Sequence, residues 1–145
     1  MSIDKKFIGK TWPAQSYDVC KEKIKEYAKA IKNPDPHYVD EEFAEKSAYG
    51  TIIAPPTFSV VFGAHLIEPI FFDNELNLNL AMLVHGEQEF EFYEVVKAGD
   101  TVTTTARISH IENKEKLDVI TIELLSKNQQ GRDVCKGIYT FVVRK

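Results

Sequence analysis

Residues 54–72, APPTFSVVFGAHLIEPIFF, form the most apolar stretch of the chain and predict a central helix. Pro55 and Pro56 lack backbone N–H groups, which the first turn of a helix leaves unpaired anyway, so they predict a helix start, and Pro69 predicts its end. The residues between are almost all apolar, as in a helix that other structure covers on every side. Because about 20 apolar residues are needed to span a bilayer, a buried core helix is the better interpretation.

Composition limits the classes of protein to which the chain can belong. Its 145 residues, 43% hydrophobic and 28% charged, predict a single domain over residues 1–145. The net charge of −4 disfavours a nucleic-acid partner, since the lysines alternate with glutamates. Cys20 and Cys135 are far apart and lack metal-ligand spacing, so neither a disulfide framework nor a metal site is expected. The first residues, MSIDKKFIGK, contain no apolar run of signal-peptide length, which predicts a cytoplasmic protein.

The segments before the central helix predict an extended stretch and two helices. Residues 11–19 are predicted to be extended, and residues 20–31 place apolar side chains at helical spacing between lysines and glutamates. Pro34 and Pro36 end this helix and predict a rigid loop. Asp40, followed by two glutamates, predicts the N-cap of a short second helix. Residues 73–82 show no clear period and are predicted to be irregular.

From Leu83 onward the apolar period changes from helical to two. Phe90 and Phe92 alternate with glutamates, and residues 102–111, 117–126 and 134–143 predict three further strands separated by polar turns. A buried helix followed by a run of antiparallel strands predicts an α+β domain in which a long curved sheet wraps around the helix. This arrangement is the hot-dog fold.

Four motifs in this order carry a resemblance to a known family: AIKNPDPHYVDEEFA, APPTF, HGEQEFEF and VKAGDTVTTTARI. The chain resembles the MaoC-like hydratase and dehydratase superfamily, and within it the branch of amino-terminal MaoC-like dehydratase domains. The resemblance covers residues 8–144. It implies a hot-dog domain that dimerises through its sheet and binds acyl thioesters of coenzyme A or acyl carrier protein.

Catalytic members of that superfamily carry a D-x-N-P-L-H loop, whose Asp and His activate the water that adds to a 2-enoyl thioester. Such chemistry requires a paired carboxylate and imidazole that exchange protons near neutral pH. In this chain Asn33 stands in place of the Asp and Tyr38 in place of the His. An amide does not titrate, and a phenol is a poor base at neutral pH. The resemblance therefore implies a chain that shapes the acyl pocket beside a partner that carries the dyad.

Other residues near these motifs are candidates for the site, each with a structural alternative. His37, one position before Tyr38, is either a shifted catalytic base or a surface histidine of the loop. Pro56, Thr57 and Phe58 stand where the resemblance places the substrate thioester, and they equally suit a plain helix start. His85 opens a strand beside Gly86 and serves either the site or a sheet-edge contact.

The leading hypothesis is an (R)-specific enoyl-thioester hydratase or 3-hydroxyacyl-thioester dehydratase system, in which this chain is the acyl-binding subunit. The alternatives are a stand-alone hydratase that uses His37 and an acyl-thioester binding or thioesterase-like protein without hydration chemistry. The expected partners are an acyl-CoA or acyl-ACP thioester and a second hot-dog chain, in a homodimer or a heterodimer. No cofactor, nucleic acid or membrane is expected.

Overall fold

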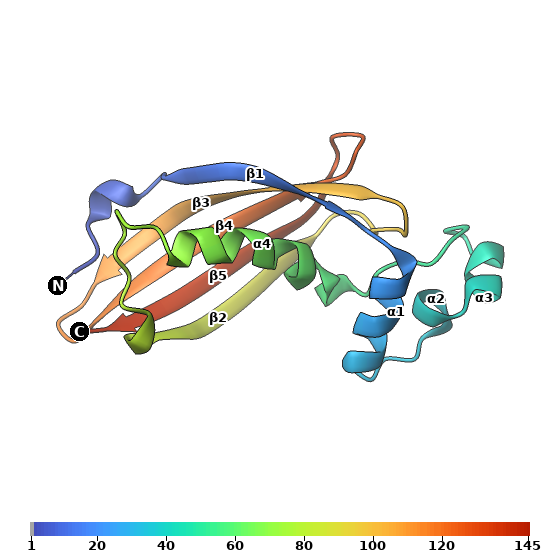
Figure 1. The fold of residues 1–145 in the computed structure, drawn as a ribbon, viewed down its shortest axis with the longest axis horizontal. Coiled ribbons are helices and arrows are strands. Elements are labelled where there is room, and N and C mark those ends of the chain that lie inside the picture. The colour runs from blue at the N-terminus through green and yellow to red at the C-terminus, as the bar shows by residue number, and fades with distance from the viewer. Residues whose placement is uncertain (1) are drawn as a thin grey trace.

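A five-stranded antiparallel sheet with one helix across its face forms the body of the molecule (Figure 1). The computed structural model describes residues 2–145. The strand order is β1-β3-β4-β5-β2, so β1 and β2 are the edge strands. The strands are β1 (Thr11–Asp18), β2 (Leu83–Phe92), β3 (Thr101–Asn113), β4 (Leu117–Lys127) and β5 (Asp133–Arg144). The predicted hot-dog fold and its α+β class are thus confirmed.

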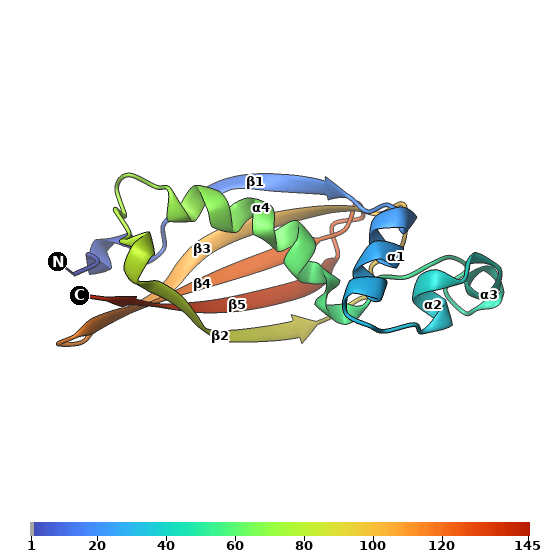
Figure 2. The ribbon, with the colours of Figure 1, turned by 60° about the horizontal axis from the view of Figure 1, so that its bottom comes forward.

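The helices fall into two groups. The central helix α4 (Ser59–Phe71) lies against the sheet and is entered through the 3₁₀ turn η2 (Pro56–Phe58). Three shorter helices, α1 (Lys21–Ala30), α2 (Pro36–Val39) and α3 (Glu41–Lys46), gather beyond one end of the sheet, opposite the chain termini (Figures 1 and 2). Further 3₁₀ turns are η1 (Lys5–Phe7) and η3 (Leu80–Met82).

The hydrophobic core lies between α4 and the sheet. Strands β3 and β4 bury every second side chain along much of their length, the period that a sheet with one covered face requires. Leu66 and Ile70 of α4 pack into the same cluster as Ile108, Ile122 and Phe141 of the sheet. The helix approaches the sheet most closely at Gly63. A Cβ atom there would lie 2.9 Å from the Tyr139 hydroxyl oxygen, so a larger residue would push the two layers apart.

The structure corrects the prediction that α4 is covered on every side. Ala64, His65 and Glu68 are exposed, because a single layer of sheet covers only one side of the helix. The helix also continues through Pro69 and ends at Phe71. The N–H that Pro69 lacks would bond the carbonyl of His65, on the exposed side of the helix, where water can reach that oxygen.

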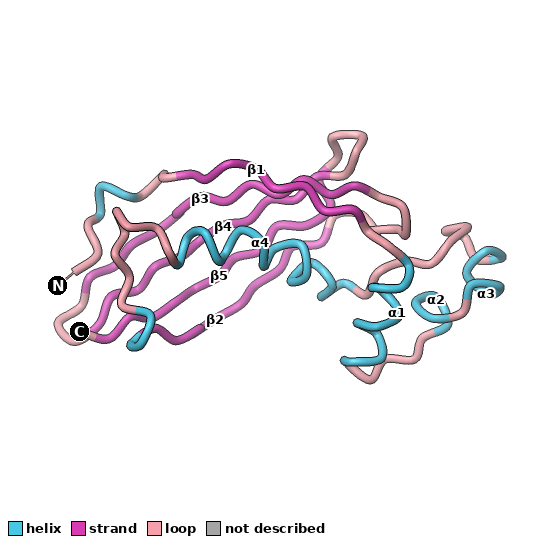
Figure 3. Tube along the Cα trace, in the orientation of Figure 1, coloured by secondary structure: helices cyan, strands magenta, loops and turns pink. Residues whose placement is uncertain are grey.

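The structure also corrects two segments predicted to lack helix (Figure 3). The proline loop contains the short helix α2, because Pro36 suits a first helical turn and the Asp35 side chain accepts the His37 N–H at 2.9 Å. The irregular segment 73–82 contains η3. Asp40 caps α3 as predicted, accepting the Phe43 N–H at 3.0 Å.

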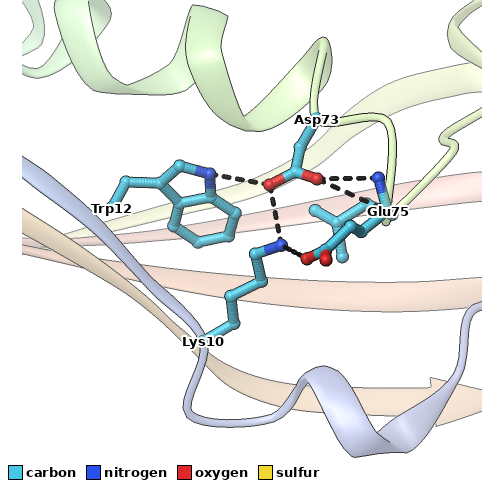
Figure 4. A network of polar contacts seen from close by, with 5 residues as sticks. Lys10, Trp12, Asp73 and Glu75 are labelled. Carbon is cyan, nitrogen blue, oxygen red and sulfur yellow. Dashed lines mark hydrogen bonds and ion pairs between the residues drawn. The ribbon is translucent and has the colours of Figure 1, made fainter.

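A polar cluster around Asp73 fixes the chain where α4 ends (Figure 4). One carboxylate oxygen of Asp73 lies 2.9 Å from Lys10 Nζ and accepts the Trp12 indole N–H at 3.0 Å. The other oxygen accepts the backbone N–H groups of Glu75 at 2.9 Å and Leu76 at 3.4 Å. Lys10 also pairs with the Glu75 carboxylate. These contacts tie the end of α4 to the segment that leads into β1.

Candidate acyl-binding site

A cavity of about 340 Å³ opens at the N-terminal end of α4. It lies between the start of that helix, α2 and the segment that follows β2. Most of its lining is apolar: Ile53, Ala54, Pro55, Pro56, Phe58, Phe62, Phe92, Val95, Val96 and Val134. An apolar lining with few polar groups is typical of a site that takes up a hydrocarbon chain.

The sequence forms this end of the cavity through its two prolines. Pro55 precedes η2, and Phe58, which is 1% exposed, leads directly into α4. Neither residue provides a side-chain cap. The first N–H groups of α4 therefore have no side-chain acceptor, and the positive end of the helix dipole lies beside the cavity.

Tyr38 lines the cavity from α2 and is half-buried. Burial raises the pKa of its phenol, and the negative charges of Asp35 and Tyr49 raise it further. Tyr38 consequently remains a neutral phenol near pH 7. It offers a hydroxyl to a ligand but cannot serve as a base there.

His37 is not part of the cavity lining and pairs with Asp35. Its Nδ1 atom lies 2.8 Å from an Asp35 carboxylate oxygen, and its ring packs edge-on against Phe43 at 4.9 Å and Tyr49 at 5.9 Å. Hydrogen bonds from the His37 backbone N–H and its ring lower the pKa of Asp35. This carboxylate therefore orients the imidazole at the edge of the site.

The remaining predicted residues lie in three different places. Asn33 lies beside α1, in a surface groove separate from the cavity, and its side-chain oxygen accepts the Asp35 N–H at 3.3 Å. Thr57 is exposed, and its hydroxyl lies 2.9 Å from the Tyr27 hydroxyl, which donates to it. The structure thus brings Tyr38, Pro56 and Phe58 together in one cavity and leaves Asn33, His37 and Thr57 around it.

His85 lies apart from all of these, on β2. Its ring stacks against Tyr139 at 5.8 Å and packs on Phe141 at 4.8 Å. It borders a second apolar cavity of about 590 Å³ on the uncovered face of α4, beside Val60 and Ile67. His85 thus belongs to the open face between α4 and the edge strand.

Sequence reasoning missed the polar residues in the cavity wall. Ser59 is 7% exposed, and its hydroxyl oxygen has no hydrogen-bond partner within residues 2–145. The Cys135 thiol lies beside it; burial raises the pKa of that thiol, and its contact with the Ser59 side chain lowers the pKa by less. Tyr93 donates to Glu91 at 2.6 Å, which raises the pKa of Tyr93 to about 12. Ser59 and Cys135 are 76 residues apart, so no local motif could have paired them.

The described residues set limits on other kinds of site. Within residues 2–145, no group of three histidine, cysteine or acidic side chains is arranged to hold a metal ion. None of the helices in this range combines the length and apolar content needed to cross a bilayer.

Comparison with known proteins identifies the family. Residues 6–137 match the model of the FAS1-like dehydratase domain region. The chain belongs to this family. A relative from Saccharopolyspora erythraea, a UPF0336 protein, is 35% identical over 145 residues, covering 99% of this chain and 93% of the relative. A UPF0336 protein of Streptomyces avermitilis is 34% identical, with 99% and 97% covered.

Solved structures show that this dehydratase-family chain shares its fold with MaoC-like dehydratases. The truncated HadBC complex of Mycobacterium tuberculosis, a 3R-hydroxyacyl-ACP dehydratase, matches with a TM-score of 0.81 and 24% identity over 94% of this chain and 96% of that one. The MaoC-like dehydratase of Rhodospirillum rubrum matches with a TM-score of 0.73 and 20% identity, covering 95% and 92%. At these identities the likeness shows the shared fold.

Proposed function

We propose that this chain is the acyl-binding subunit of an (R)-specific enoyl-thioester hydratase or 3-hydroxyacyl-thioester dehydratase. The observation that carries the proposal is the apolar cavity at the start of α4, which has the lining of a hydrocarbon site and lacks an Asp/His pair. Tyr38 lines that cavity, and the resemblance aligns it with the histidine of catalytic members. The cavity excludes water from the acyl chain, and the first N–H groups of α4 favour a carbonyl oxygen at its end.

A partner chain then supplies the acid and base. The uncovered face of α4 and the edge strand β2 lie side by side and present apolar side chains, among them Phe72, which is 67% exposed, and the half-buried Ile67 and Leu83. Exposed apolar surface of this kind and an unpaired strand edge both favour association. The named complexes HadBC and ChsH1-ChsH2 of Mycobacterium tuberculosis share the fold and support such pairing.

The charges on β2 favour a different chain over a second copy. Glu87, Glu89 and Glu91 alternate along one face of this exposed edge strand. A two-fold antiparallel pairing of β2 centred between Glu87 and Glu91 would place these carboxylates opposite one another, and like charges in that position destabilise a sheet. A partner strand with neutral or basic residues avoids this repulsion.

Calorimetric titration with acyl-coenzyme A tests the proposal. Val95 lies at the cavity and is 38% exposed, so Val95→Trp fills the site without disturbing the core. We expect this variant to lose at least about tenfold in affinity for a medium-chain acyl-coenzyme A, equal to 1.4 kcal/mol. The matched control is Val119→Trp on β4, which does not line the cavity. Equal affinity of wild type and Val95→Trp would rule out this cavity as the acyl site.

One observation favours a second function, a hydratase that works alone. The 2.8 Å contact between His37 and Asp35 orients the imidazole in the way that a general base requires. Under this function His37→Ala abolishes hydration of crotonyl-coenzyme A and leaves acyl binding intact. If the chain is instead an acyl-binding subunit, His37→Ala changes neither hydration of crotonyl-coenzyme A nor acyl binding.

A further inference from the structure

A row of lysines runs along one face of α1, beside the acyl site. Lys21, Lys25 and Lys29 are spaced four residues apart, which places them on one side of α1, and Lys32 follows in the turn after the helix. Lys21 and Lys29 are eight positions apart, so the helical part of the row is about 12 Å long at 1.5 Å per residue. Glu22 and Glu26 lie at its margin.

This row carries an excess of positive charge. Glu41 of α3 accepts both Lys21 at 2.6 Å and Lys25 at 2.9 Å, so one carboxylate serves two ammonium groups. The same contacts lower the pKa of Glu41 to about 2. Within residues 2–145, Lys29 and Lys32 have no carboxylate oxygen within 4.0 Å, and both are exposed.

An apolar groove of about 560 Å³ accompanies the lysines. Ala28, Pro34 and Val39 line it together with Lys25, Lys29 and Lys32. A groove with an apolar floor and a rim of one charge is the kind of surface on which an amphipathic helix of opposite charge docks.

The groove lies next to the acyl cavity. The short helix α2 contributes Tyr38 to the cavity and its neighbour Val39 to the groove. From the other side, Tyr27 of α1 packs edge-on against Phe58 at 5.5 Å, at the entry to α4. Figures 1 and 2 show α1 and α2 together at the end of the sheet where α4 begins.

We propose that this lysine-rimmed groove docks an acidic helix of a carrier protein that delivers the acyl thioester. The inference rests on the proposed acyl-binding function and adds the identity of the carrier. An acidic helix with carboxylates one turn apart matches a row of ammonium groups with the same spacing. Its apolar side chains would cover Ala28, Pro34 and Val39.

The groove suits the phosphates of coenzyme A less well. Its charges extend along a helix instead of converging on one point. Neither an arginine nor an aromatic side chain lines the groove to stack on adenine.

Binding of one acyl group on two carriers tests the inference. The dissociation constants of 3-hydroxybutyryl acyl carrier protein and 3-hydroxybutyryl-coenzyme A are measured with wild type, Lys29→Glu/Lys32→Glu and the milder Lys29→Gln/Lys32→Gln. The matched control is Lys5→Glu/Lys116→Glu, at two exposed lysines outside the groove. We expect the Lys29/Lys32 charge reversal to weaken carrier-protein binding at least about tenfold, with a smaller loss for the glutamine pair and a flatter salt dependence. Binding of the coenzyme A thioester and the behaviour of the control stay unchanged.

Other outcomes overturn the inference. An equal loss of affinity for both thioesters would mean that the groove binds a part that the two share. No loss of affinity for either would mean that the lysines are solvent-exposed charges without a role in binding. Wild type that binds the coenzyme A thioester but not the carrier protein would overturn this inference and leave the proposed function standing. Binding of neither thioester would overturn both.

Discussion

Ser59 is the residue whose burial most needs a functional explanation. Folding removes its hydroxyl from water without giving it a protein partner, and an unsatisfied buried hydroxyl is destabilising. A second buried serine provides the contrast, because Ser126 lies 2.8 Å from the hydroxyl of Thr104 in the core. Ser59 lines the acyl cavity, and Ser126 does not.

Replacing each serine by alanine distinguishes a hydroxyl that stabilises the fold from one that is free to bind a ligand. We expect Ser59→Ala to leave the free energy of unfolding unchanged or to raise it by about 1 kcal/mol, since no hydrogen bond is lost and an unsatisfied buried hydroxyl is removed. Ser126→Ala leaves the buried Thr104 hydroxyl without its partner and should cost about 1–2 kcal/mol. Urea denaturation measures both values. An equal cost for the two variants would mean that Ser59 has a structural partner after all.

The end of α4 shows how one carboxylate can fix an element. Partial burial opposes ionisation of Asp73, but hydrogen bonds from Lys10, the Glu75 and Leu76 amides and the Trp12 indole outweigh it. They hold the Asp73 pKa below its ordinary value of 3.8. A carboxyl group with a lowered pKa in the folded state stabilises that state fully above about pH 4. This contribution disappears as the pH falls through the folded-state pKa.

Asp73→Asn tests this anchor through its pH dependence. At pH 7 we expect the variant to be about 1–2 kcal/mol less stable than wild type, because the charge-assisted hydrogen bonds are lost. As the pH falls below 3.8, Asp73 takes up a proton and the difference should shrink. Asp133→Asn is the control, since its ion pair with Lys127 is exposed and worth no more than about 0.5 kcal/mol. A difference that stays constant between pH 7 and pH 3 would contradict the assignment.

The strands could be predicted from the sequence, and the cavity walls could not. The alternation of Phe90 and Phe92 with glutamates, and the polar turns between strands, are local signals that the structure follows closely. The helix α2 was missed because four residues show no apolar period and its start depends on the Asp35 cap. The open side of α4 was missed because composition indicates that a helix is apolar without indicating how many layers cover it.

Some residues of the candidate site could likewise be predicted from the sequence, and others could not. Pro56 and Phe58 lie in the turn that leads into α4, Tyr38 lies on α2, and motif reasoning placed all three at one site. Asn33 and Tyr38 are only five residues apart, yet the turn of α2 directs them to different cavities. The direction in which a side chain points in or beside a short helix depends on how that helix is capped. The spacing of residues in the sequence does not reveal this direction.

At the scale of the whole molecule, the proposed function assigns separate tasks to the two ends of the sheet and to its open face. The chain termini lie toward one end of the sheet and the helices α1–α3 beyond the other (Figure 1). The Asp73 anchor lies where α4 ends, and the candidate acyl cavity lies where α4 begins. The apolar face of α4 beside β2 lies between them. This division is what we expect of a subunit that holds an acyl chain while another chain, docked on the open face, performs proton transfer.

Hydration of crotonyl-coenzyme A, followed by the loss of enoyl absorbance, tests this division of labour most directly. The chain is assayed alone and after mixing with a MaoC-like chain that carries the intact Asp/His loop. We predict at least about 10²-fold slower turnover for the chain alone, because general acid–base groups commonly contribute 10²–10⁴ in rate. Val95→Trp should reduce the turnover of the mixture. Equal turnover by the chain alone would contradict the proposal that its partner supplies the acid and base.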